Sequence, residues 1–312
     1  MRPLMLLILL GVAVATPVAA AERLTLLLDW FVNPDHAPII VADELGYFAD
    51  AGLEVEIVAP ADPNDPPKLV AAGQADVAIS YQPQLHIQVD QGLPLARIGT
   101  LVATPLNSLV ALADGPIREI ADLEGRKIGF SVGGFEDALL GAMLGHHGVR
   151  LADVELVNVN FALSPALLSG QVDAVIGAFR NFELNQLELE GRPGRAFYPE
   201  EEGVPAYDEL IFIANTGALG DPRLPRFIDA IEAATLHILN HPDESFTLFV
   251  EGRPELDDEL NRRAWADTLP RFALRPAALD VARYARFAAF LEAQGLIDPP
   301  PPVNTYAVEL AR

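Results

Sequence analysis

Side chains suited to gripping a flat, nitrogen-rich ring are crowded between residues 29 and 36. Trp30 supplies an aromatic face, Asn33 an amide and His36 an imidazole. An aromatic face that stacks on a planar heterocycle adds on the order of 1 kcal/mol beyond the area it buries. We therefore predict that this stretch binds a ligand. Trp30 could instead seal the core between helices, and His36 could merely begin the helix that follows.

A second aromatic and amide pair, Tyr81 and Gln82, follows a short buried run that ends at Ser80. In an open α/β sheet, ligands collect in the crevice beyond the carboxyl ends of the strands. That geometry puts Tyr81 and Gln82 on the same rim as Trp30. We predict that Trp30 and Tyr81 hold a planar heterocycle between them, although Tyr81 could also be a core residue.

The second half of the chain offers a matching wall. Gly133 and Gly134 would let the backbone approach a ligand closely, and the amides that open the next helix would point toward it. Glu183 is placed to accept a charge-assisted hydrogen bond from an exocyclic amine or a protonated ring nitrogen, with Asn181 beside it as a further candidate. Glu183 could equally be a first-turn acid that the helix dipole favours.

Alternating strands and helices must position these residues. Apolar runs and alternating patterns predict strands at residues 24–28, 53–58, 76–80, 95–102, 108–113, 127–131, 154–158, 173–178 and 209–215. Apolar residues at helical spacing, bounded by glycine and proline, predict helices at residues 36–51, 68–72, 84–91, 120–124, 136–147, 164–169, 183–190, 226–240, 242–251, 254–269 and 276–294.

The order of these elements predicts an α/β protein with two lobes. The chain has 312 residues, more than a single core usually holds. We expect residues 22–104 and 210–312 to form a discontinuous lobe 1, with residues 105–209 inserted as lobe 2. Two crossovers, near residues 103–107 and 206–211, would then form a hinge. A two-strand hinge lets the lobes close around a ligand.

The first 21 residues are typical of a signal peptide. Met1-Arg2 gives a positive start, residues 4–15 an apolar run too short to span a membrane, and residues 18–21 the small side chains before a cleavage site. The sequence contains no Cys, so it offers no disulfide, no thiolate metal site and no cysteine for a lipid anchor. We therefore expect a freely diffusing protein of the periplasm.

Charge and motifs argue against several function classes. The formal net charge is −23, and without the signal peptide 20 basic residues against 44 acidic ones give −24. Such a surface repels nucleic acid and anionic lipid headgroups. The six His residues lack the spacing of metal ligands, and no G-x-S-x-G, Walker or dinucleotide motif is present. We therefore expect a binding module without catalytic residues, metal or cofactor, rather than an enzyme.

Several stretches carry a family resemblance, namely Leu28-Asp29-Trp30-Phe31-x-Asn33, Gly46-Tyr47-Phe48, Ser80-Tyr81-Gln82, Asp122-Leu123-x-Gly125 and Asn181-Phe182-Glu183. They are similar to those of the periplasmic substrate-binding proteins of ABC importers. Within that family the chain looks most like the ThiY-like branch, which delivers thiamine-pyrimidine precursors.

This resemblance implies a type II periplasmic-binding-protein fold, a ligand of the formylaminopyrimidine type, an ABC permease in the inner membrane as partner, and a monomer. Carried over residue by residue, the ligand contacts would be Trp30, Asn33, Tyr81 and Glu183. Two other interpretations stay open: another flat or anionic ligand, such as riboflavin or a sulfonate, and a pyrimidine-synthase-like enzyme. The yeast-type synthases carry a cysteine-rich motif, and this chain has no Cys.

Overall fold

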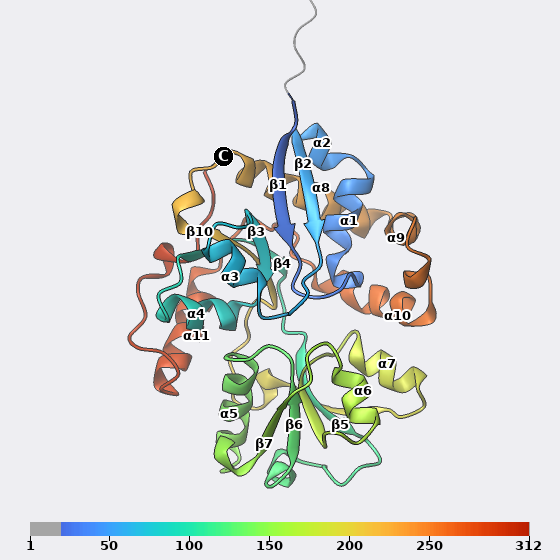
Figure 1. The fold of residues 1–312 in the computed structure, drawn as a ribbon, viewed down its shortest axis with the longest axis vertical. Coiled ribbons are helices and arrows are strands. Elements are labelled where there is room, and N and C mark those ends of the chain that lie inside the picture. The colour runs from blue at the N-terminus through green and yellow to red at the C-terminus, as the bar shows by residue number, and fades with distance from the viewer. Residues whose placement is uncertain (1–19, 312) are drawn as a thin grey trace, which may run out of the picture.

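Two five-stranded sheets, each at the centre of one lobe, organise residues 20–311, the part of the chain that the computed structural model describes (Figure 1). The predicted signal peptide covers residues 1–21, of which 1–19 lie outside the described residues. The sheet of lobe 1 has the strand order β2-β1-β3-β10-β4, with β1 at Glu22–Leu27, β2 at Leu53–Val58, β3 at Val77–Ser80, β4 at Leu95–Val102 and β10 at Leu210–Asn215. The sheet of lobe 2 has the order β7-β6-β8-β5-β9, with β5 at Asn107–Leu112, β6 at Lys127–Phe130, β7 at Glu155–Asn158, β8 at Ala174–Phe179 and β9 at Gly194–Phe197.

The two sheets follow the same plan. In lobe 1, β1 pairs in parallel with β2 and β3, while β10 runs antiparallel to β3 and β4. In lobe 2, β6 pairs in parallel with β7 and β8, while β5 runs antiparallel to β8 and β9. The loops that leave the carboxyl ends of β1, β3, β6 and β8 therefore meet between the lobes, as the rule for open α/β sheets requires of a binding site.

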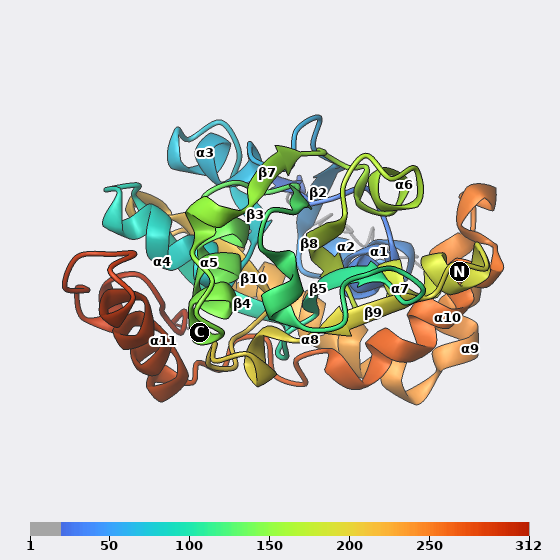
Figure 2. The same ribbon diagram turned by 90° about the horizontal axis from the view of Figure 1, so that it is seen from below.

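Helices cover both sheets. Lobe 1 carries α1 (Ala37–Glu44), α2 (Tyr47–Asp50), α3 (Pro66–Ala71), α4 (Gln82–Asp90), α8 (Arg223–Asn240), α9 (Pro242–Val250), α10 (Glu259–Thr268) and α11 (Val281–Ala293). Lobe 2 carries α5 (Glu136–His146), α6 (Leu163–Leu168) and α7 (Glu183–Leu189). In both views α5 lies on one side of the lobe 2 sheet, and α6 and α7 lie on the other (Figures 1 and 2).

The single helix predicted at residues 36–51 is wrong. The structure has a short 3-10 helix at Pro34–His36, then α1, and then α2 after a break at Gly46. Gly46 has φ 73°, a left-handed conformation that ends a helix and that glycine adopts without steric cost. The break separates α2 from α1, the helix that follows residues 29–36.

Two later helices are shorter than predicted, and one strand was missed. The segment predicted at 254–269 contains a 3-10 turn at Pro254–Leu256 and only then α10, which Asp258 caps by accepting from the N–H of Asn261. The helix predicted at 276–294 begins at Val281, after an Asp280 cap. The missed strand, β9, has only four residues and forms an edge of its sheet, so its sequence shows no sustained alternation.

Two crossover segments, residues 103–106 and 198–209, connect the lobes. One buried carboxylate ties them together, because Oε2 of Glu209 accepts from the N–H of Leu106 at 2.6 Å and of Asn107 at 2.9 Å. Burial raises the pKa of Glu209 to about 7, against those two bonds, which lower it. The two hinge segments are thus joined side by side.

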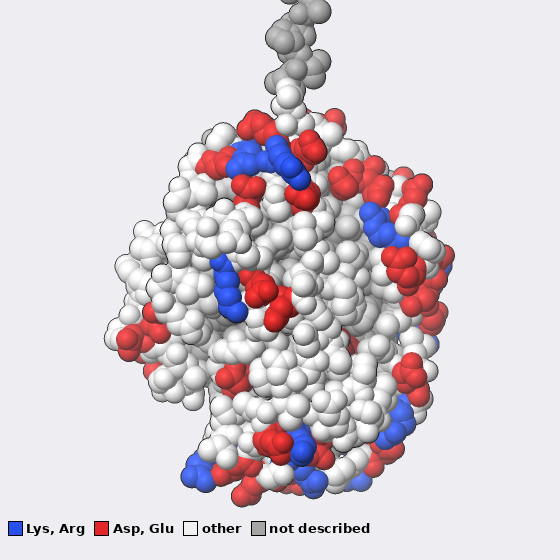
Figure 3. All heavy atoms as spheres, in the orientation of Figure 1, with Lys and Arg blue, Asp and Glu red and all other residues white. Residues whose placement is uncertain are grey.

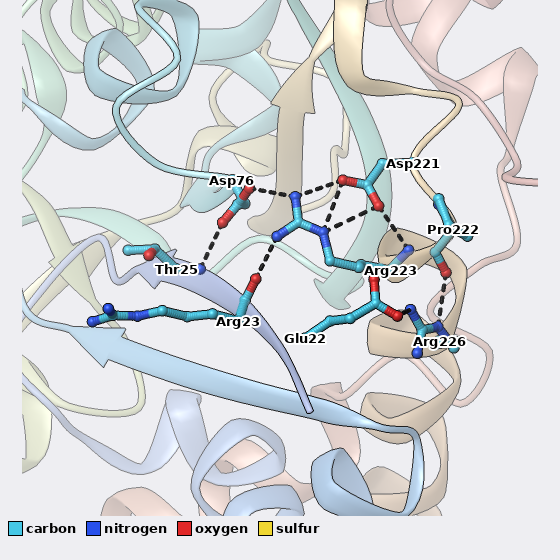
Figure 4. A network of polar contacts seen from close by, with 8 residues as sticks. All are labelled: Glu22, Arg23, Thr25, Asp76, Asp221, Pro222, Arg223 and Arg226. Carbon is cyan, nitrogen blue, oxygen red and sulfur yellow. Dashed lines mark hydrogen bonds and ion pairs between the residues drawn. The ribbon is translucent and has the colours of Figure 1, made fainter. Parts of the chain in front are cut away.

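The far end of lobe 1 is fastened by Arg223, at the start of α8 (Figure 4). Its guanidinium donates to Asp221, to Asp76 beside β3 and to the carbonyl oxygen of Arg23 in β1. Asp76 in turn accepts from the N–H of Thr25 at 2.8 Å. This network holds the amino ends of the strands, opposite the loops that face lobe 2.

On the face shown in Figure 3, acidic side chains cover more of the surface than basic ones, and they gather along the side of lobe 1 where α9 and α10 lie. This distribution agrees with the negative charge computed from the sequence. In the range 20–311, no helix combines the length and apolar character needed to cross a membrane.

Candidate ligand-binding site

A pocket with an empty volume of about 440 Å³ lies between the lobes. Lobe 1 contributes Asp29, Trp30, Asn33, Asp35, His36, Tyr81 and Leu210 to its lining. Lobe 2 contributes Glu136, Leu163, Gly177, Phe179, Phe182 and Glu183. Of the residues predicted from the sequence, the structure brings Trp30, Asn33, His36, Tyr81 and Glu183 together here.

A buried network around Asp29 fixes the lobe 1 wall. The hydroxyl of Tyr81 donates to Oδ2 of Asp29 at 2.8 Å, and Nε2 of His36 lies 3.0 Å from Oδ1. Nδ1 of His36 accepts from the N–H of Asn33 at 3.3 Å. This network assigns the imidazole proton to Nε2, which donates to Asp29. Each of these polar groups is satisfied by another, so the wall is formed before a ligand arrives.

The side-chain amide of Asn33 makes hydrogen bonds within its own loop. Its Oδ1 accepts from the N–H of Asp35 at 2.8 Å, and its Nδ2 donates to the carbonyl oxygen of Phe31 at 3.1 Å. The side chain thereby caps the 3-10 helix at residues 34–36. Asn33 lines the pocket chiefly as the residue that shapes the loop.

Aromatic rings from the two lobes touch beside the pocket. The Trp30 indole meets Phe161 edge-on, with ring centroids 4.6 Å apart. The Tyr81 ring stacks on Phe135, with centroids 4.7 Å apart and planes inclined by 23°. Because Trp30 and Tyr81 belong to lobe 1 and their partners to lobe 2, these contacts bring the two lobes together around the pocket.

Two glutamates form the polar part of the lobe 2 wall. Oε2 of Glu183 accepts from the N–H of Phe179 at 2.7 Å. Oε2 of Glu136 accepts from the N–H groups of Ser131, at 2.8 Å, and Val132, at 3.1 Å. Burial raises the pKa of both carboxyls to about 8, although the bonds from the loop amides act in the opposite direction. These acids can therefore exchange a proton near neutral pH.

Glycine is required at position 177 in the lobe 2 wall. Its φ is 94°, a conformation that L side chains rarely adopt. A Cβ at this position would lie 2.6 Å from Cδ of Glu136, which is closer than such atoms approach. Gly177 therefore gives the Glu136 carboxyl the space that it occupies.

Asn181 joins the lobes instead of lining the pocket. Its Nδ2 donates to Oδ1 of Asp35 at 2.6 Å and to Oγ1 of Thr268 at 2.7 Å, both in lobe 1. Burial raises the pKa of Asp35 to about 6, while His36 and the bonds from Asn181 and Thr268 act to lower it. Asn185 adds an exposed bond between the lobes, to Asp267 at 2.8 Å.

Three other predicted residues also turn away from the pocket lining. Gln82 accepts from the N–H of Asp208 at 2.8 Å, so it contacts the hinge. The N–H of Gly133 donates to Oδ1 of Asn64 at 3.0 Å, and the N–H of Gly134 donates to Asp137 at 2.6 Å. The sequence suggests that this loop presents free amides to a ligand. In the structure, the amides of Gly133 and Gly134 are bound by side-chain oxygens instead.

Sequence reasoning missed several lining residues. Asp29 and Phe179 stand directly after predicted strands and Phe182 a few residues further on, and that position alone could have marked them. The sequence predicts Glu136 as the first residue of a helix, and its inward direction depends on the bonds to the loop amides. Gly177 lies inside a strand, where the sequence offers no signal of a ligand pocket.

Residues that would mark other chemistries lie elsewhere. Both lysines are more than half exposed, Lys68 beside Asp65 at 4.0 Å and Lys127 paired with Glu155 at 3.3 Å. Across residues 20–311, no three His, Cys, Asp or Glu side chains cluster in a way that could hold a metal ion.

The model of the family described as NMT1/THI5 like matches residues 33–245, which include all of the pocket lining except Asp29 and Trp30. The chain belongs to this family. Its fold is that of the periplasmic binding proteins. The alkanesulfonate-binding protein SsuA of Xanthomonas axonopodis pv. citri, solved with MOPS bound, superposes with a TM-score of 0.73 at 16% identity, covering 93% of this chain and all of that one.

Relatives of this NMT1/THI5-like chain carry three kinds of name. A Haemophilus influenzae protein provisionally named for thiamine biosynthesis is 53% identical, with 96% of each chain covered. A formylaminopyrimidine-binding protein of Halalkalibacterium halodurans is 33% identical over 80% of this chain and 76% of its own. A 4-amino-5-hydroxymethyl-2-methylpyrimidine phosphate synthase of Legionella pneumophila is 27% identical over 87% of this chain and 88% of its own.

Proposed function

We propose that this protein is the periplasmic solute-binding component of an ABC importer, and that it captures a thiamine-precursor pyrimidine of the formylaminopyrimidine type. The ligand binds between the lobes, and the closed protein, a monomer, delivers it to a permease in the inner membrane. The 33% identical formylaminopyrimidine-binding protein supports this ligand, and the predicted signal peptide supports the location.

The observation that carries the proposal is the pairing of aromatic and acidic groups in one pocket. Trp30 and Tyr81 supply aromatic rings from lobe 1. Glu183 and Glu136 supply carboxyl groups from the opposite wall, in lobe 2. An aminopyrimidine has a flat face for stacking and an exocyclic amine for a carboxylate to accept. Closure then follows from ligand contacts that only the closed form can make.

A binding role is favoured over catalysis by the position of the lysines. A synthase that handled an aldehyde cofactor through a Schiff base would need a lysine at the pocket. Lys68 and Lys127 are both exposed and paired with surface acids. The chain also has no Cys, whereas the yeast-type synthases that it resembles carry a cysteine-rich motif.

Titration calorimetry with formylaminopyrimidine, thiamine, riboflavin and MOPS tests the ligand. We expect saturable binding of formylaminopyrimidine at one site per chain. Binding of riboflavin or MOPS alone would keep the fold and overturn the ligand. Incubation with pyridoxal phosphate and histidine, followed by mass spectrometry, tests the enzymatic alternative, because only a synthase would form the pyrimidine product.

A further inference from the structure

A pocket lined by four carboxylic acids offers little to an anion. Asp29, Asp35, Glu136 and Glu183 all line it, and within the described part of the chain no Lys or Arg joins them. The imidazole of His36 accepts a hydrogen bond at Nδ1, as a neutral ring does. A phosphate or sulfonate buried here would lack a counterion, and an unpaired buried charge is strongly unfavourable.

The backbone N–H groups that could bind an anion are already engaged. Glycine-containing loops that lead into a helix commonly hold phosphate through such groups. In the loop between β6 and α5, the four successive N–H groups of residues 131–134 each donate to a side-chain oxygen. The acceptors are Glu136, for the first two, and then Asn64 and Asp137.

Glu136 is the acceptor among these three that lines the pocket. Its Oε2 lies 2.8 Å from the amide nitrogen of Ser131 and 3.1 Å from that of Val132. One oxygen bound by two adjacent amides is the arrangement that a phosphate oxygen would take in an anion-binding loop. The carboxyl thus fills the position from inside the protein, and Gly177 leaves the space for it.

We propose that Glu136 determines ligand class, because it occupies the amides of the β6–α5 loop and so excludes phosphate- and sulfonate-bearing ligands. The pocket then selects heterocycles that are unphosphorylated and either uncharged or cationic. This inference rests on the proposed function for the identity of the heterocycle. A phosphate ester would have to displace Glu136 from two N–H groups and then lie among the remaining acids.

Calorimetry with 4-amino-5-hydroxymethyl-2-methylpyrimidine and its phosphate ester tests the inference. For the wild-type protein we expect the ester to bind at least about 100-fold more weakly than the alcohol, since its phosphate must displace Glu136 from two N–H groups and then lie buried without a counterion. Glu136→Ala frees the two amides, and we expect it to narrow this gap to about tenfold or less. An unchanged gap in that variant, or equal binding of both ligands by the wild type, would overturn the inference.

Two control variants test whether the affinity gap depends on occupancy of the amides or on any substitution near this loop. Glu136→Gln keeps an oxygen on the N–H groups of Ser131 and Val132, so we expect it to retain the gap. Asp137→Ala frees the amide of Gly134 outside the pocket lining, and we expect it also to retain the gap. Glu136→Ser replaces Glu136→Ala in the same test if thermal unfolding shows that the alanine variant does not fold.

Failure of the proposed ligand is distinguishable from failure of this inference. If the wild type binds neither pyrimidine, the ligand assignment is wrong, and inorganic phosphate and MOPS become the probes. Binding of either anion by Glu136→Ala and not by the wild type would still support the role of Glu136. Binding by the wild type, or by neither protein, would overturn it.

Discussion

The two walls of the pocket use acids in different ways. On the lobe 1 wall, Asp29 accepts from the side chains of Tyr81 and His36, so that the aromatic and polar groups hold one another in place. On the lobe 2 wall, Glu136 and Glu183 accept from backbone N–H groups of their own loops, and burial raises the pKa of each to about 8. The lobe 1 wall is therefore fixed in shape by the bonds to Asp29. On the lobe 2 wall, Glu136 and Glu183 can change protonation state near neutral pH.

This difference suggests that the two walls recognise different parts of the ligand. A preorganised aromatic wall loses little entropy on binding, so it suits the recognition of a flat ring. Acids that gain or lose a proton on contact suit the recognition of an amine or a ring nitrogen. The four predictions that follow test each wall separately, from the largest expected effect to the smallest.

Gly177→Ala should damage the lobe 2 wall most. The substitution combines a strained backbone with overlap of the Glu136 carboxyl, and we expect it to lower the free energy of unfolding by about 2–4 kcal/mol. Gly170→Ala is the matched control, because Gly170 also has positive φ, 73°, but open space around its Cβ position. Urea unfolding should show a loss of only about 1 kcal/mol for the control. Equal losses would mean that contact with Glu136 is unimportant.

Trp30→Ala should remove the stacking face of the lobe 1 wall. We expect binding of formylaminopyrimidine to weaken by about 1–3 kcal/mol, roughly fivefold to more than a hundredfold. Phe31→Ala is the control, since Phe31 is 42% exposed, packs on the same Phe161 and does not line the pocket. Calorimetry that finds equal losses for both variants would assign Trp30 to packing between the lobes.

Glu183→Gln should affect only ligands that carry the exocyclic amine. A bound amine favours the ionised form of Glu183, so the change replaces a charge-assisted hydrogen bond by a neutral one, and we expect about tenfold weaker binding of the aminopyrimidine. An analogue without the amine should bind the variant and the wild type alike. If the variant lost affinity equally for both ligands, Glu183 would have a structural role rather than the one proposed.

The pH dependence of stability should also reflect the lobe 2 wall. The pKa of Glu183 is about 8 in the folded protein, above its value of 4.5 for an ordinary glutamate, so the folded state binds more protons than the unfolded state between these values. Stability contributed by protonated Glu183 is therefore lost as the pH rises through this window. Glu183→Gln should make the decline shallower, by at most about 1.4 kcal/mol per pH unit. Urea unfolding of the ligand-free proteins at several pH values measures both slopes, and identical slopes would contradict the raised pKa.

Much of the fold was predictable because buried strands have a plain signature. The apolar and alternating runs at residues 53–58 and 95–102 coincide with β2 and β4, and the return of β10 to lobe 1 was expected from chain order. Errors occurred where local pattern is weak. The break at Gly46 lies inside continuous helical spacing, and the four residues of β9 owe their conformation to pairing with β5.

The site was predictable on one wall and less so on the other. Tyr81 stands directly after β3 and Trp30 a few residues after β1, and strand order alone puts such residues at the crevice. In the β6–α5 loop, Gly133 and Gly134 suggest backbone contact with a ligand, which stays a prediction, whereas the structure shows Asn64 and Asp137 accepting from their amides. Which side chain satisfies a loop amide depends on distant residues, and a single sequence does not reveal that choice.

Tryptophan fluorescence tests the central claim that an aminopyrimidine binds between the lobes against Trp30. The chain has two Trp residues, and Trp265 is buried against Phe246 and Phe249 in lobe 1. A Trp265→Phe variant therefore leaves Trp30 as its single indole. We predict a saturable change in its emission on titration with formylaminopyrimidine and none with MOPS. A calorimetric binding signal without any change in emission would contradict this account, because the ligand would then bind away from Trp30.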